Sequence, residues 1–159
     1  MAYETTTVAV ERSQSELRKL LTKYGASRFA FGEERDGTTG ERHAAVTFVR
    51  DSYTVRMRVP LKQVDERVVG QRYMRARTKT RDEIRDELYE QEERRIWRVL
   101  AWNLKARMVA VEEGVETFEE AFLSHLVNPA SGRTVYEQLS EDGRIELPAP
   151  LLALPVGDA

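Results

Sequence analysis

Hydrophobic and polar residues alternate through much of residues 28–60, which is the period of a strand whose side chains point to opposite faces in turn. The alternation is interrupted by a glycine-rich segment at residues 35–42 and by the short Asp51-Ser52 pair. The pattern therefore predicts an antiparallel meander of three strands, at residues 28–34, 43–50 and 53–60.

The last of these strands separates its side chains by chemistry. Tyr53, Val55, Met57 and Val59 fall on one face, and Thr54, Arg56 and Arg58 fall on the other. We expect the sheet to bury the first face and to expose the second as a wet, basic surface.

The beginning of the chain predicts a strand followed by a helix. Residues 5–11 alternate between apolar and polar side chains and are rich in β-branched residues, which favours a short first strand. Ser13 and Glu16 follow at capping-box spacing. Apolar residues then recur at helical intervals up to Gly25, at Leu17, Leu20, Leu21 and Tyr24. A helix is predicted over residues 13–24.

From residue 82 to residue 113 the pattern indicates one long helix that ends at Gly114. Its first turns are acidic, which suits the positive end of the helix dipole. Within residues 94–108, steps of about 100° per residue place apolar side chains around most of the circumference. Such a helix must be covered on more than one side, by the sheet and by a neighbouring helix or subunit.

Two more capping boxes follow the long helix. Thr117 and Glu120 begin an apolar helix, and Thr134 and Glu137 begin a last short one. The predicted fold is therefore α+β: a strand, a helix, a three-stranded antiparallel meander, a long helix and two shorter helices.

The length of 159 residues suits one domain, expected over residues 1–145, with a proline-rich apolar tail at 146–159. Between the meander and the long helix, residues 62–81 show no clear period and are predicted to form a basic loop.

Composition narrows the classes of function. The 25 basic and 27 acidic residues leave a net charge of −2, so nucleic-acid binding would need local clustering of cations. The absence of cysteine excludes disulfides, thiolate metal sites and a cysteine nucleophile, and suits a reducing cytoplasm. No apolar run approaches the roughly 18 residues that span a bilayer, so we expect a cytoplasmic protein that is not exported.

The predicted loop concentrates positive charge. Five cations occur in it without one acid between them, interleaved with Tyr73: Arg72, Arg75, Arg77, Lys79 and Arg81. A long irregular segment in a compact domain is usually functional or disordered. These cations either bind an anionic partner or pair with the acidic residues 82–93 that follow.

A second basic group lies on the long helix. Arg94, Arg98, Trp102 and Lys105 share the narrow strip that the apolar residues leave free. Cations beside an aromatic ring on a rigid helix suit phosphate binding and base stacking. The alternative is an ordinary solvated face. Arg56 and Arg58 on the open sheet face are a third source of cations.

The motifs of common enzymes are absent. His43 and His125 are the only imidazoles, and no zinc-protease, phosphate-loop or serine-hydrolase motif occurs. Acidic clusters at residues 33–36 and 112–120 leave a magnesium-dependent nuclease as an alternative. We expect no catalytic residue, no metal and no cofactor.

Three segments carry a resemblance. "AYETTTVAVERSQSELRKLL", "YTVRMRVPL" and "WNLKARMVAVEEGVETFEEAFLSHLV" resemble small proteins of tailed phages and prophages, many from actinobacterial hosts, for which no activity is assigned. The element order is also similar to the cores of double-stranded-RNA-binding domains and phage single-strand-annealing recombination proteins. That similarity is at the level of the fold and transfers no residue role.

These observations favour a phage accessory protein that binds single-stranded DNA or distorted duplex, works without enzymatic chemistry and forms homo-oligomers. In this hypothesis the loop of residues 72–81 closes over the strip of Arg94, Arg98, Trp102 and Lys105. One alternative is an oligomeric counter-defence protein that sequesters a small signalling nucleotide with the same arginines. Another is a structural or host-interaction protein without either ligand.

Overall fold

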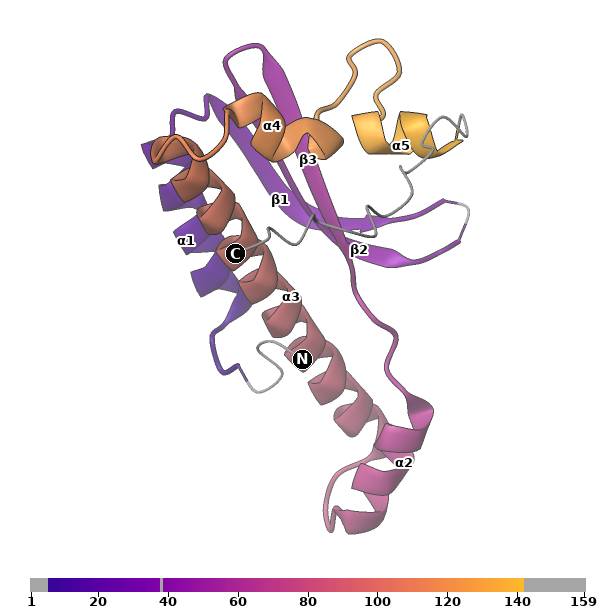
Figure 1. Cartoon of the computed structure of the whole chain (residues 1–159). Coiled ribbons are helices and arrows are strands. Elements are labelled where there is room, and N and C mark those ends of the chain that lie inside the picture. The colour runs from indigo at the N-terminus through magenta and orange to yellow at the C-terminus, as the bar shows by residue number, and fades with distance from the viewer. Residues whose placement is uncertain (1–5, 38, 142–159) are drawn as a thin grey trace, which may run out of the picture.

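The computed structural model describes residues 6–37 and 39–141 (Figure 1). In chain order its elements are α1 (Val10–Lys23), β1 (Arg28–Arg35), β2 (Arg42–Arg50), β3 (Tyr53–Pro60), α2 (Glu66–Arg75), α3 (Arg81–Glu112), α4 (Phe118–Phe122), the 3-10 turn η1 (Leu123–His125) and α5 (Val135–Glu141). The α+β fold is confirmed, although one predicted strand is missing and one helix is additional. The tail predicted at residues 146–159 lies outside the described residues.

The three strands form one antiparallel sheet in the order β1-β2-β3, as the alternation predicted. Val46 pairs with Met57 and Phe48 with Val55, so these four apolar side chains lie on one face. Asp51 occupies the tight turn between β2 and β3 with φ of 52°. Aspartate tolerates this left-handed conformation better than most residues, which explains why the two-residue connection works.

The predicted strand at residues 5–11 is wrong for the part that the structure describes. Residues 6–9 are not extended in any sheet, and α1 begins at Val10, before the predicted cap at Ser13. Ser13 is instead fully buried inside the helix. The reason is packing: Val10, Leu17 and Leu21 continue one apolar stripe that packs into the core, and a helix places them on the same side.

Helix α3 is the centre of the fold. It lies beside α1, contacts the sheet, and contacts α4 at its far end (Figure 1). Trp97 is 2% exposed and meets Phe31 edge-on, with 6.3 Å between ring centroids. The prediction that this helix is covered on more than one side is therefore confirmed. None of the described helices is both long and apolar enough to cross a membrane.

The basic segment at residues 62–81 is mostly not a loop. Asp65 caps a helix, α2, by accepting a hydrogen bond from the Arg67 backbone N–H at 2.8 Å. Val69 of α2 and Ile84 of α3 are both buried where the two helices pack. Helix α2 and the first turns of α3 form a helical hairpin that projects beyond the sheet (Figure 1).

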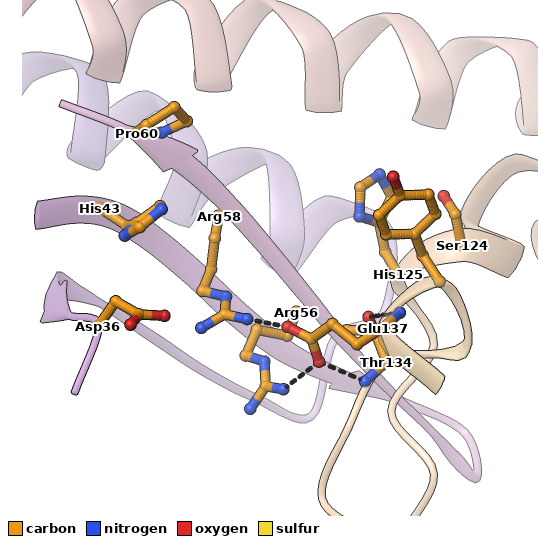
Figure 2. A pocket seen from close by; sticks show the side chains of 10 residues that line it. Asp36, His43, Arg56, Arg58, Pro60, Ser124, His125, Thr134 and Glu137 are labelled. Atoms are coloured by element: carbon orange, nitrogen blue, oxygen red, sulfur yellow. Dashed lines mark hydrogen bonds and ion pairs between the residues drawn. The ribbon is translucent and has the colours of Figure 1, made fainter. Parts of the chain in front are cut away.

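The chain after α3 wraps around the sheet edge. Both predicted capping boxes are present, at Thr117 with Glu120 and at Thr134 with Glu137. Between them, the Val127 N–H donates to the Thr54 carbonyl at 2.8 Å and extends the edge of β3. Helix α5 then lies over the face of β3 that was predicted to be open to water (Figure 2).

Candidate nucleic-acid interface

The predicted binding residues fall into three separate places. Arg72, Tyr73, Arg75, Arg77, Lys79 and Arg81 lie around the hairpin tip, by which we mean residues 72–81; Arg94, Arg98, Trp102 and Lys105 lie along the middle of α3; Arg56 and Arg58 lie on β3. Seventeen residues of straight helix separate Arg81 from Arg98, a distance of about 25 Å. The end of the segment near Arg81 therefore does not close over the strip on α3. Arg72, farther back on α2, lines a hollow together with Gln91 and Arg95, next to Arg94.

The arginines on β3 are bound by the protein's own carboxylates. Figure 2 shows Glu137 of α5 reaching both guanidinium groups, with 3.1 Å from Arg56 Nη2 to the carboxylate. Arg56 also donates to the Gly132 carbonyl at 2.9 Å, and Arg58 lies 3.7 Å from Glu34. The prediction of a wet, basic sheet face is therefore only partly right: Arg58 stays exposed, but α5 lies over this face and Glu137 neutralises both arginines.

Beside this ion-pair cluster lies a cavity of about 510 Å³ between β3 and the segment that contains η1 and α5 (Figure 2). His43, His125 and Tyr136 contribute to its lining. Burial lowers the pKa of His125 below its ordinary value, and the charge of Arg107 lowers it further. The folded protein therefore favours the neutral imidazole of His125.

This shift has a consequence for stability. The unfolded chain takes up a proton at an ordinary pKa of 6.5 while folded His125 still resists one. The contribution of His125 to the free energy of unfolding is therefore fully present above pH 6.5, and it is lost as the pH falls below that value. We expect His125→Gln to flatten the decrease in unfolding free energy between about pH 7 and pH 5, measured by urea denaturation. Ser124→Ala should keep the wild-type slope, and an equal slope in the His125 variant would contradict the assignment.

The strip on α3 is largely neutralised. Arg98 pairs with Glu16 of α1, and Arg94 lies 3.6 Å from Glu90. Lys105 makes no ion pair with the residues that the structure describes. The indole of Trp102 is 61% exposed. This surface thus offers an exposed aromatic ring but little uncompensated positive charge.

The hairpin tip keeps more uncompensated positive charge than the strip on α3, because the carboxylates around it bind Arg85 or Lys79. Arg85 binds Glu66 at 2.7 Å and also binds Asp82, and Lys79 binds Glu87. The hydrogen bond from Arg85 lowers the pKa of Glu66. The sequence left open whether the acidic start of α3 neutralises the basic segment. It does so for Lys79 and does not reach the arginines of α2.

Four arginines remain without a carboxylate partner among the described residues: Arg67, Arg72, Arg75 and Arg77. All four are exposed, and no side-chain hydrogen bond holds their guanidinium groups within the described ranges. We call them the free arginines. Arg67 was absent from the predicted site; its spacing of eight residues from Arg75 places it on the same helix face once α2 is recognised.

Exposed apolar side chains accompany the free arginines. Met74 is 85% exposed and Tyr73 is 42% exposed, with the Arg81 guanidinium 5.4 Å from the tyrosine ring centroid. A shallow hollow of about 530 Å³ lies beside them, lined by residues that include Tyr73, Arg77 and Arg81. The tip thus combines guanidinium groups with a ring on which a planar group can stack.

Within residues 6–37 and 39–141, no three acidic or histidine side chains come together in a way that could hold a metal ion. Comparison with protein-family models, with curated proteins and with solved structures finds no match to this chain. Function is therefore inferred from the geometry and chemistry of the described residues.

Proposed function

We propose that this protein is a non-enzymatic accessory protein that holds single-stranded or distorted nucleic acid at the tip of the α2–α3 hairpin. The observation that carries the proposal is the set of free arginines on a projecting helix. The chain as a whole has a net charge of −2, so its surface does not attract polyanions in general. Uncompensated charge is concentrated where the hairpin extends away from the sheet (Figure 1).

The chemistry of the tip suits phosphate. A guanidinium group can donate two parallel hydrogen bonds to one phosphate, and four such groups on one helix and its C-terminal end can follow a flexible backbone. Tyr73 and Met74 offer apolar surface at the same place. Unpaired bases can stack on such a ring, whereas the bases of an intact duplex are already stacked. Single-stranded or distorted nucleic acid is thus favoured over regular duplex.

The alternative ligand, a small signalling nucleotide, has less support. It requires arginines that converge on a pocket. Arg72 and Arg95 share one hollow and Arg77 and Arg81 share another, shallow one, while Arg56 and Arg58 line the cavity beside α5. Glu137 already binds both, so a nucleotide would have to displace that carboxylate. A structural or host-interaction role predicts that the protein binds neither nucleic acid nor a small nucleotide. The binding experiment described next distinguishes this role from the other two.

The test is salt-dependent binding of a labelled single-stranded oligonucleotide, with duplexes and cyclic nucleotides as competitors, followed by fluorescence anisotropy. The combined variant Arg72→Gln, Arg75→Gln and Arg77→Gln should bind at least about tenfold more weakly at low salt. The slope of log affinity against log salt should become shallower by about 2, since each lost contact to single-stranded phosphate accounts for about 0.7.

The matched control removes three exposed cations outside the hairpin: Lys19→Gln, Arg28→Gln and Arg35→Gln. It changes the net charge equally and should keep most of the affinity and the slope. Equal losses in both triple variants would show that net charge alone is responsible. Absence of salt-dependent binding in the unmodified protein would refute the proposal.

A further inference from the structure

Helix α3 carries a second apolar stripe on the side that faces away from the core. Val99, Trp102, Ala106 and Val109 follow one another at spacings of three, four and three residues. Trp102 is 61% exposed, Val109 is 38% exposed, Ala106 is exposed and Val99 is half-buried. Isolated exposed apolar residues are ordinary, but this spacing is that of the a and d positions in helix-on-helix packing. We call these four residues the outer stripe.

Near the N-terminal end of α3, the face that carries the outer stripe already packs against helix α2. Leu88 lies fourteen residues before Trp102, which is two heptads along the same line of the helix. Leu88 and Val68 of α2 line a shared hollow of about 480 Å³, so α2 lies against this line of α3. Helix α2 does not extend along the rest of α3 (Figure 1). The outer stripe is thus the continuation of a face that accepts a helical partner within the chain.

The outer stripe is complementary to itself when two copies run antiparallel. A two-fold axis opposite Leu104 places Val99 against Val109 of the second copy. The same axis places Trp102 against Ala106 of the second copy, so the largest side chain meets the smallest one. In antiparallel helix pairs a positions face d positions, which is this arrangement. A parallel pair would instead set two indoles together and leave two alanines facing each other across a gap.

The charges at the ends of the outer stripe agree with this orientation. Arg95 precedes Val99 by four residues, and Glu113 follows Val109 by four. The Arg95 guanidinium already binds Glu92 through both Nε and Nη2, at 2.8 Å each, and its side chain is 11% exposed, whereas Glu113 is exposed just after α3. Antiparallel pairing keeps the Glu113 carboxylates of the two copies apart, whereas parallel pairing sets these like charges against each other.

We propose that α3 pairs with α3 of a second copy of this chain, antiparallel, through Val99, Trp102, Ala106 and Val109. The contact is short, so dimerisation is reversible and depends on micromolar protein concentration. The hairpin tips then point in opposite directions, and each tip stays accessible. The pairing does not depend on what the tips bind.

Sedimentation velocity of the full chain over a micromolar range tests the pairing. We expect a species of twice 18.3 kDa whose fraction rises with concentration. Trp102→Glu should raise the dimer dissociation constant at least tenfold while the circular dichroism spectrum is unchanged. Leu123→Glu is the matched control, since Leu123 is 55% exposed on η1, and it should leave the dissociation constant as it is.

Cross-linking tests the register. The chain has no cysteine, so Val99→Cys and Val109→Cys each introduce a unique thiol. A short thiol cross-linker should join the two variants when they are mixed and allowed to exchange, and should join neither variant to itself. Self-linking of either variant would overturn the antiparallel pairing. A chain that stays monomeric at all concentrations, with or without Trp102, would overturn the dimer, whichever segment covers the stripe instead.

Discussion

Trp97→Ala should lower the free energy of unfolding by about 3–5 kcal/mol, the largest loss that we expect from a single substitution in this chain. Trp97 is 2% exposed and belongs to the core that residues of α1, the sheet, α3 and α4 form together. Truncation removes its contact with Phe31 and leaves a cavity that a closely packed core cannot fill completely. Urea denaturation followed by circular dichroism measures the change.

The chain provides its own control for this experiment, five residues along the same helix. Trp102→Ala deletes the same atoms from a side chain that is 61% exposed. At concentrations where the protein is monomeric, its effect should stay within about 0.5 kcal/mol, as for ordinary surface positions. Comparable losses at the two tryptophans would show that the outward face of α3 is buried in the monomer, which would also contradict the dimer interface.

The second large effect is expected at Glu137. Glu137→Ala leaves Arg56 and Arg58 facing a covered surface without their carboxylate, although a third or less of each of these three side chains is exposed. Glu137 also accepts the Thr134 backbone N–H at 2.8 Å and so caps α5. We expect a loss of about 2–3 kcal/mol, less than for a wholly buried pair because water still reaches these groups.

Glu120→Ala separates the two roles of Glu137. Glu120 caps α4 in the same way, by accepting the Thr117 N–H at 2.8 Å, and that hydrogen bond lowers its pKa. No arginine contacts the Glu120 carboxylate within the described residues. Its loss should cost about 1 kcal/mol, the usual effect of removing a cap. If Glu137→Ala costs no more than this, the ion pairs on β3 contribute nothing measurable.

Local sequence patterns correctly predicted the strands and helices whose boundaries are marked by residues within a few positions of one another. The three strands were placed to within a residue at either end, because alternation and turn residues are read over a few positions. The capping boxes at Thr117 and Thr134 were also recognised. The corresponding box that begins α3, Thr80 with Glu83, carries the same local signal and was overlooked.

Helix α2 shows where such patterns become ambiguous. It has ten residues, one of them Gly70, and Val69 is its only fully buried side chain. A helix this short is marginal by itself and is stabilised by packing on α3. Its sequence alone therefore resembles a basic loop, and the cations were recognised before the helix that arranges them.

The sequence alone was enough to indicate which residues carry charge, which are apolar and where most elements begin and end, because these depend on neighbours within a few positions. Only the tertiary structure decided which charges are free. Glu137 is 81 residues from Arg56, and Glu16 is 82 residues from Arg98. Such partners meet when helices and strands pack, and no local spacing encodes their approach. The arginines of α2 remain available because they lie on a projecting helix, where Glu66 and Asp82 already bind Arg85.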